Sequence, residues 1–134
     1  MAGLRVVVVE DEPGILDIIQ VNLERAGYNV VPARDGMEAC RVLDGTDCDA
    51  VILDLGLPAI SGFRLARLLR YDPKWKKIPV VVVTGFDFAE VEEIADERIQ
   101  AFIKKPFDPA ELVSKLKYAM ARSRASPDLE EQLL

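Results

Sequence analysis

Five short apolar runs, separated by longer amphipathic stretches, constrain the fold of this chain more than any other feature of its sequence. The runs are rich in β-branched residues, as is typical of strands buried on both faces of a sheet. The stretches between them repeat apolar residues at helical spacing, so strands and helices alternate. This alternation predicts repeated β-α units. The five predicted strands are Arg5–Val9, Asn29–Ala33, Ala50–Asp54, Val80–Thr84 and 101–103.

Residues that favour helix ends mark the amphipathic stretches. Asp35 and Asp108 are good N-caps, and Pro109 suits the first position of the last helix. Gly27 is suited to the left-handed position that closes a first helix. The segment 88–96 has few large apolar residues and is the weakest predicted helix. The predicted helices begin near Ile15, Asp35, Ser61, Phe88 and Asp108. With five strands and five helices, we expect an α/β fold: a doubly wound parallel sheet in three layers.

The overall composition excludes several classes of protein. The formal net charge is -6, the wrong sign for a surface that neutralises nucleic-acid phosphates or anionic lipid. No apolar run approaches the length of a membrane span, and the N-terminus lacks a secretion signal, so we expect a cytoplasmic domain. The chain has no histidine, which removes His-based catalysis, and its two cysteines are predicted to be reduced structural thiols.

Polar side chains gather where the predicted strands end. In a parallel sheet the carboxyl ends of the strands lie at one edge, next to the ligand site. The first strand leads into Glu10, Asp11 and Glu12, the third ends in Asp54, and the others lead to a threonine and two lysines. Carboxylates suit Mg²⁺, and a carboxylate beside Mg²⁺ can act as a nucleophile toward phosphorus. A lysine and a hydroxyl would bind the phosphoryl oxygens.

Four short motifs carry a resemblance to a known family. Over about residues 4–122 the chain resembles the receiver domain of two-component response regulators, and the intervals between the motifs make the resemblance specific. It implies a flavodoxin-like sheet with strand order 2-1-3-4-5. The motifs are Glu10-Asp11-Glu12-Pro13, Asp54-Leu55-Gly56-Leu57-Pro58, Thr84-Gly85 and Lys105-Pro106-Phe107.

The resemblance assigns the metal and phosphoryl sites residue by residue. It implies that Asp54 is the phosphoacceptor and that Mg²⁺ is held by Asp11, Asp54 and the backbone carbonyl of Gly56. Glu10 would act on the metal through a bound water. The function implied is a switch that takes a phosphoryl group from a partner histidine kinase or phosphotransfer protein. Such a switch is not an enzyme beyond its own phosphoryl transfer and dephosphorylation.

The same resemblance implies a conformational switch. Thr84 and Lys105 would contact the phosphoryl group, and the Lys105-Pro106 bond would be cis. Phosphorylation would draw Thr84 inward and let Phe102 occupy the vacated space, which changes the surface around the fourth helix, the fifth strand and the fifth helix. An ordinary core aromatic is the competing interpretation of Phe102.

Other functions fit the residues less well. Phosphatases of the haloacid dehalogenase type want a second aspartate two residues after the first, and position 56 is Gly56. A flavin carrier on this fold would need a hydroxyl-rich loop after the first strand. A receiver-like docking module that works without phosphorylation stays an alternative.

The domain organisation is predicted from the same patterns. Residues 1–122 form the receiver domain, and residues 123–134 are either a tail or the start of a linker helix to an output or kinase domain after residue 134. A phosphorylation-dependent dimer is possible for such a domain, although the acidic segment 88–96 departs from a common dimer pattern. Around Trp75, three lysines form either a solvated loop or a basic aromatic docking patch.

Overall fold

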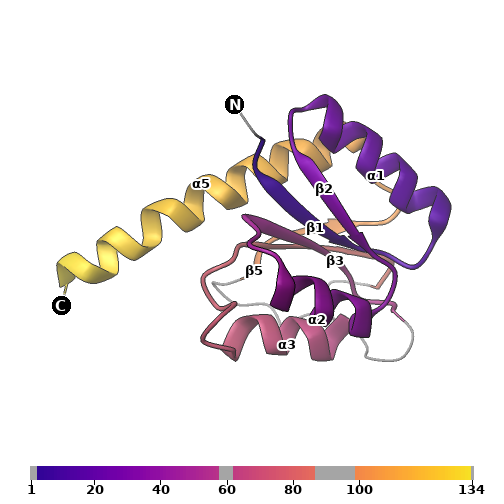
Figure 1. Ribbon diagram of the computed structural model, residues 1–134. Coiled ribbons are helices and arrows are strands. Elements are labelled where there is room, and N and C mark those ends of the chain that lie inside the picture. The colour runs from indigo at the N-terminus through magenta and orange to yellow at the C-terminus, as the bar shows by residue number, and fades with distance from the viewer. Residues whose placement is uncertain (1–2, 58–61, 87–98, 134) are drawn as a thin grey trace.

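The computed structural model describes residues 3–57, 62–86 and 99–133 and has one five-stranded parallel sheet (Figure 1). Its strand order is β2-β1-β3-β4-β5, so the predicted flavodoxin-like order is confirmed. The strands are β1 (Arg5–Val9), β2 (Asn29–Ala33), β3 (Ala50–Asp54), β4 (Val80–Thr84) and β5 (Ile99–Lys104). The described helices are α1 (Pro13–Arg25), α2 (Gly36–Gly45), α3 (Gly62–Tyr71) and α5 (Pro109–Leu133).

Alternation along the strands divides the core between the two faces of the sheet. Val6 and Val8 of β1 pack in a cluster with residues of α1 and α5, whereas Val7 and Val9 pack in a cluster with residues of α2 and α3. Figure 1 shows the same division, with α1 and α5 on one side of the sheet and α2 and α3 on the other. Because both faces are covered, β1, β3 and β4 read as continuous apolar runs. The three predicted layers are confirmed.

The predicted helix caps are present in the structure. The Asp35 carboxylate accepts a hydrogen bond from the backbone N–H of Glu38 at 2.7 Å. Asp108 accepts one from the backbone N–H of Ala110 at 2.9 Å. Each bond satisfies a donor that the first turn of its helix leaves without an intrahelical partner. Both helices therefore begin where the sequence predicts.

Some sequence predictions lie outside the described residues or differ from the structure. The predicted helix at 88–96 and the predicted helix start at Ser61 fall on residues that the structure does not describe. Strand β5 runs from Ile99 to Lys104, longer than the predicted 101–103, because it pairs with β4 along its length. The helix α5 continues to Leu133, and its relation to any further domain stays a prediction.

Trp75 corrects the interpretation of the lysine-rich loop. Its side chain is 7% exposed and belongs to the core cluster on the α2 and α3 side of the sheet. Lys74, Lys76 and Lys77 around it are exposed. The indole is therefore part of the core, and a docking patch built on it is wrong. The sequence gives no sign of this because a single buried residue among three exposed lysines forms no periodic pattern.

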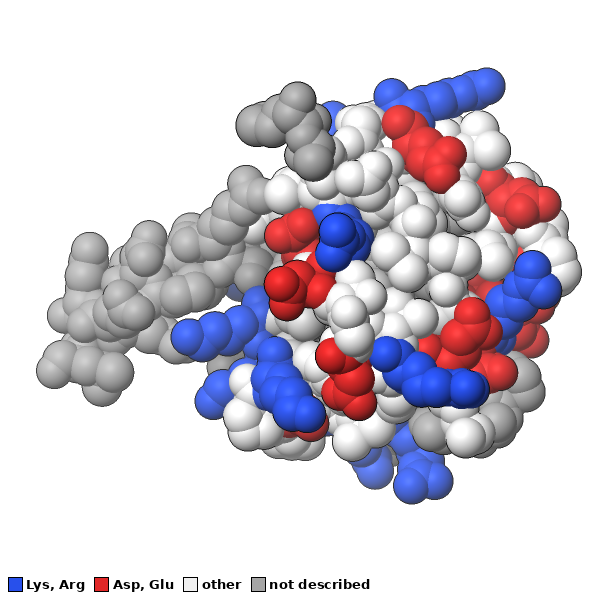
Figure 2. Space-filling view, in the orientation of Figure 1, with Lys and Arg blue, Asp and Glu red and all other residues white. Residues whose placement is uncertain are grey.

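Charge on the surface is mixed. Figure 2 shows basic and acidic side chains interspersed over the face in view, with no large area of one sign. Among the described residues, no helix is long and apolar enough to cross a membrane.

Candidate functional site

The carboxyl ends of four strands bring the candidate site together. Glu10 directly follows β1, Asp54 ends β3, Thr84 ends β4, and Lys105 directly follows β5. The parallel registers place β1, β3, β4 and β5 side by side in that order. These four side chains are far apart in sequence and meet because parallel strands end at one edge of the sheet.

Three carboxylates form the acidic part of the site. One oxygen each from Glu10, Asp11 and Asp54 lie within 4.8 Å of one another. Glu10 is 1% exposed and Asp54 is 5% exposed, whereas Asp11 is the most exposed of the three. Hard oxygen donors crowded in this way match the ligand preference of Mg²⁺. The sequence prediction that these acids cluster is confirmed.

Lys105 extends into the acidic cluster and pairs with its buried members. Its Nζ lies 2.8 Å from Glu10 Oε1 and 3.1 Å from Asp54 Oδ2. The Lys105 side chain is only 15% exposed, so these ion pairs are largely shielded from solvent. In the structure the ammonium partly offsets the repulsion between the two buried carboxylates.

Burial shapes the protonation of Glu10 and Lys105. The pKa of Glu10 is raised from 4.5 to about 7, chiefly by desolvation. The Lys105 ammonium opposes this rise in pKa, and the Asp54 carboxylate adds to it. For Lys105, desolvation lowers the pKa, but the close ion pair with Glu10 and the charge of Asp54 outweigh it, so that the pKa is raised above its usual 10.5. Lys105 is therefore a cation at neutral pH.

The environment of Glu10 Oε1 is consistent with a metal ion bound at this edge of the sheet. This atom is buried and makes no hydrogen bond of good geometry, although Lys105 lies within ion-pair distance. The other carboxylate oxygen, Oε2, accepts the backbone N–H of Glu12 at 3.3 Å. A buried anionic oxygen with unused acceptor capacity is suited to a cation or to a water bound to one.

Two short turns hold Asp54 and Thr84 in place. The backbone N–H of Gly56 donates to Asp54 Oδ1 at 3.0 Å, and the backbone N–H of Phe86 donates to Thr84 Oγ1 at 3.0 Å. Gly56 is exposed and lies two residues after the phosphoacceptor candidate Asp54, where its carbonyl is predicted to serve as a ligand. Both side chains are therefore oriented by the loop that follows their own strand.

Phe102 lies in β5, one residue before the buried Ile103. It is partly buried and packs against the core cluster on the α2 and α3 side of the sheet. Its backbone carbonyl accepts a hydrogen bond from Lys115 Nζ of α5 at 3.0 Å. Its predicted role as a switch residue stays a prediction. The predicted cis bond between Lys105 and Pro106 is present.

Glu12 is a neighbour of the site to which sequence reasoning assigned no role. Its carboxylate oxygen Oε1 lies 4.0 Å from Lys105 Nζ, and its side chain is 62% exposed. The available signal was its position directly after Asp11 in a run of three acids. Sequence alone does not tell which acids of such a run face inward.

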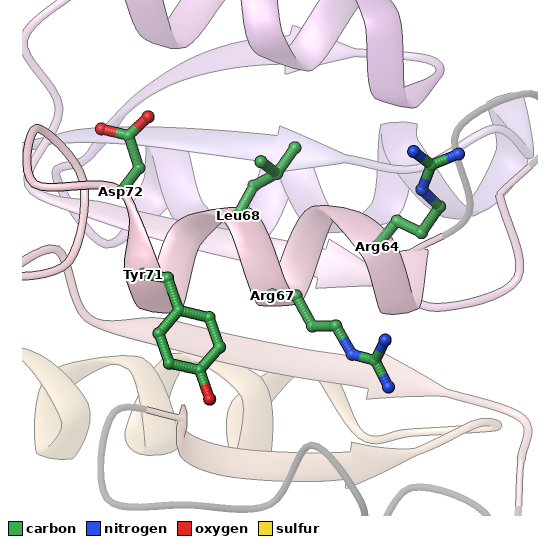
Figure 3. Close-up of a pocket in the computed structure, with 5 residues that line it drawn as sticks. All are labelled: Arg64, Arg67, Leu68, Tyr71 and Asp72. Carbon is green, nitrogen blue, oxygen red and sulfur yellow. The ribbon is translucent and has the colours of Figure 1, made fainter.

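A separate surface pocket of about 490 Å³ lies along α3 (Figure 3). Its described lining comes from α3 and the residue directly after it: Arg64, Arg67, Leu68, Tyr71 and Asp72. None of the residues at the carboxyl edge of the sheet is among these five, so the pocket is distinct from the acidic site.

Fold and site together define a flavodoxin-like domain with carboxylates, a lysine and a hydroxyl at the carboxyl edge of its sheet. The sequence matches the response regulator receiver domain over residues 6–117, and the chain belongs to this family. The resemblance found in the sequence motifs is confirmed.

Relatives of known identity agree with this assignment. The chain is 37% identical to the phosphate regulon transcriptional regulatory protein PhoB of Pseudomonas aeruginosa, covering 92% of this chain and 54% of the relative. It is 35% identical to the transcriptional regulatory protein KdpE of Mycobacterium tuberculosis, covering 96% and 56%. The chain thus spans about half the length of these regulators.

A solved structure adds a metal to the comparison. The receiver domain of sensor histidine kinase PA1611 from Pseudomonas aeruginosa PAO1 is similar with a TM-score of 0.80 and 27% identity, covering 90% of this chain and 99% of that one. That structure is described as having a magnesium ion coordinated in its active site cleft.

Proposed function

We propose that this domain is a signalling switch that accepts a phosphoryl group onto Asp54. The observation that carries the proposal is the arrangement of Lys105 against buried Glu10 and Asp54, with Asp11 beside them. One buried carboxylate flanked by a cation and further acids is suited to in-line attack on phosphorus. The family of the domain supports the same assignment.

In the proposed reaction, a carboxylate oxygen of Asp54 attacks the phosphorus of a phosphohistidine on a sensor histidine kinase or a phosphotransfer protein. The new bond is an acyl phosphate O–P bond, the N–P bond of the phosphohistidine breaks, and the released imidazole nitrogen takes up a proton. Lys105 Nζ donates to a phosphoryl oxygen, and the Thr84 hydroxyl, which accepts the backbone N–H of Phe86 in the structure, donates its own proton to another.

Mg²⁺ is the proposed cofactor, held by Asp11, Asp54 and the carbonyl of Gly56, with Glu10 acting through a water. When bound, it supplies positive charge that neutralises the charge developing on the phosphoryl oxygens. The clustered carboxylate oxygens and the unused acceptor capacity of Glu10 support this set of ligands.

The domain is proposed to act as a switch and not as an enzyme that turns over a separate substrate. Since the relatives are about twice as long as this chain, an output domain linked beyond residue 134 belongs to the same proposal. A phosphorylation-dependent dimer is proposed with it. Reaction with a sensor histidine kinase also implies a cytoplasmic location. The switch motion of Thr84 and Phe102 would transmit phosphorylation to the surface near β5 and α5.

Intact mass spectrometry tests the proposal directly. The chain is incubated with Mg²⁺ and acetyl phosphate, beside Asp54→Asn and the surface control Asp44→Asn. We expect one labile phosphoryl adduct on the parent and on Asp44→Asn, and none on Asp54→Asn. A folded parent that binds Mg²⁺ and takes no adduct would instead favour the docking module.

A further inference from the structure

Glu12 places a third negative charge around Lys105. Lys105 Nζ already pairs with Glu10 at 2.8 Å and Asp54 at 3.1 Å, and Glu12 Oε1 lies 4.0 Å away on the solvent side. Glu10 and Asp54 are buried, whereas the Glu12 side chain is 62% exposed. Glu12 is therefore the outermost of the three acids, in the position where solvent meets the site.

The main chain of Glu12 has a separate role that a side-chain substitution leaves intact. Its backbone N–H donates to Glu10 Oε2 at 3.3 Å, and its backbone carbonyl accepts the N–H of Leu16 at 2.9 Å in the first turn of α1. The residue is thus held by its backbone while its carboxylate projects toward Lys105. A glutamine would keep the length and the backbone contacts and would remove only the charge.

An anionic phosphodonor must approach the cation that Glu12 faces. A carboxylate a few ångströms from Lys105 reduces the attraction of that ammonium for phosphoryl oxygens and repels the incoming donor. The repulsion increases with the charge of the donor and decreases with ionic strength, because the carboxylate is exposed and mobile ions screen it.

We infer that Glu12 is a specificity-determining residue that disfavours small, highly charged phosphodonors at the site. The inference rests on the proposed phosphorylation of Asp54 and adds to it the class of donor that the site selects against. A phosphohistidine presented by a protein partner brings its own surrounding charges and so can offset the repulsion that a free dianion meets.

The test compares rates of phosphorylation in the parent, Glu12→Gln, the charge-preserving Glu12→Asp and the distant control Asp44→Asn. Two donors are used at neutral pH: acetyl phosphate, a dianion, and phosphoramidate, a monoanion. At saturating Mg²⁺ and low ionic strength, we expect Glu12→Gln to react about 2- to 4-fold faster with acetyl phosphate. The gain should be smaller with phosphoramidate and should shrink in high salt.

A second readout separates this role from a structural one. Glu12→Gln should need more Mg²⁺ for half-maximal rate, because a negative charge near the metal is lost, while its rate at saturating Mg²⁺ rises. A change that loosened the site would also raise the Mg²⁺ requirement, but it would lower the rate at saturating Mg²⁺, so the direction of that rate separates the two roles. Glu12→Asp and Asp44→Asn should behave like the parent.

Three outcomes would overturn the inference. Equal rates for the parent and Glu12→Gln with both donors would show that the charge has no effect on the approach of donors. A slower Glu12→Gln at saturating Mg²⁺ would make Glu12 a supporting ligand or a structural residue. If the parent takes no phosphoryl group from either donor, the proposed function fails together with this inference. If the parent is phosphorylated and Glu12→Gln reacts at the same rate, the inference alone fails.

Discussion

Among the described residues, Glu10 is the most buried charged side chain. It is 1% exposed and directly follows β1, whose residues after Arg5 are all buried valines. Placing a carboxylate at the end of such a strand costs solvation, which the contact with Lys105 offsets in part. The residue is therefore a sensitive reporter of the charge state of the whole site.

We predict that without Mg²⁺ the free energy of unfolding falls by about 1–3 kcal/mol as the pH rises from about 5 to about 7.5. Burial raises the folded-state pKa of Glu10 from 4.5 to about 7, so the folded protein holds a proton that the unfolded chain releases. The stabilisation is complete below pH 4.5 and is lost as the pH rises through about 7.

Urea unfolding at a series of pH values measures this dependence. Glu10→Gln removes the titrating group and should flatten the curve over the same range. Parallel curves for the parent and Glu10→Gln would contradict the prediction, because the slope would then come from other groups.

At the scale of elements, the site depends on how closely α3 approaches the end of β3. A Cβ added at Gly62 would collide with the backbone of Asp54 and Leu55. Backbone atoms of a buried strand have no freedom to move aside. Gly62 therefore lets the first turn of α3 lie directly against the strand that carries the proposed phosphoacceptor.

Gly62→Ala should destabilise the protein by at least about 2 kcal/mol, because the strand or the helix must shift to accept the methyl group. The same shift should slow phosphorylation of Asp54. Gly14→Ala in α1 is the matched control: a Cβ there has no neighbour within 4 Å, and the better helix propensity should leave stability unchanged or raise it by up to about 1 kcal/mol.

Thermal unfolding of the two variants beside the parent gives the comparison. If Gly62→Ala melts at the temperature of the parent, the packing of α3 against β3 is looser than the structure indicates.

At the scale of the whole molecule, the sheet gathers charges that oppose one another. β1 and β3 bring Glu10, Asp11 and Asp54 to one edge of the sheet, and Lys105, directly after β5, lies against Glu10 and Asp54. A divalent cation that binds only the folded arrangement stabilises it by mass action.

Mg²⁺ at ten times its dissociation constant should stabilise the protein by about 1.4 kcal/mol. For a domain of this size this corresponds to a rise in Tm of about 2–6 °C. Asp54→Asn should lose most of the rise, whereas Asp44→Asn, at the C-terminal end of α2, should keep it. Melts recorded with EDTA and with Mg²⁺ provide the measurement, and an equal rise in Asp54→Asn would place the metal elsewhere.

The sequence was informative where local patterns carry the signal. Runs such as Val80–Thr84 predicted strands buried on both faces, and Asp35 and Asp108 predicted two helix starts. Because parallel strands end at one edge, the acids at the ends of β1 and β3 could also be assigned to one site from the sequence alone.

Tertiary structure decided which of these side chains face one another. Nothing local to Lys105 indicates that its ammonium lies between Glu10 and Asp54, or that Glu12 is the acid left at the solvent side. In the same way, only packing shows that Trp75 is in the core and not on a docking surface. Periodicity and capping depend on neighbours in the chain, so the sequence by itself determined the elements and their order. Distances, burial and pKa values depend on groups that different strands bring together, so only the folded chain determined them.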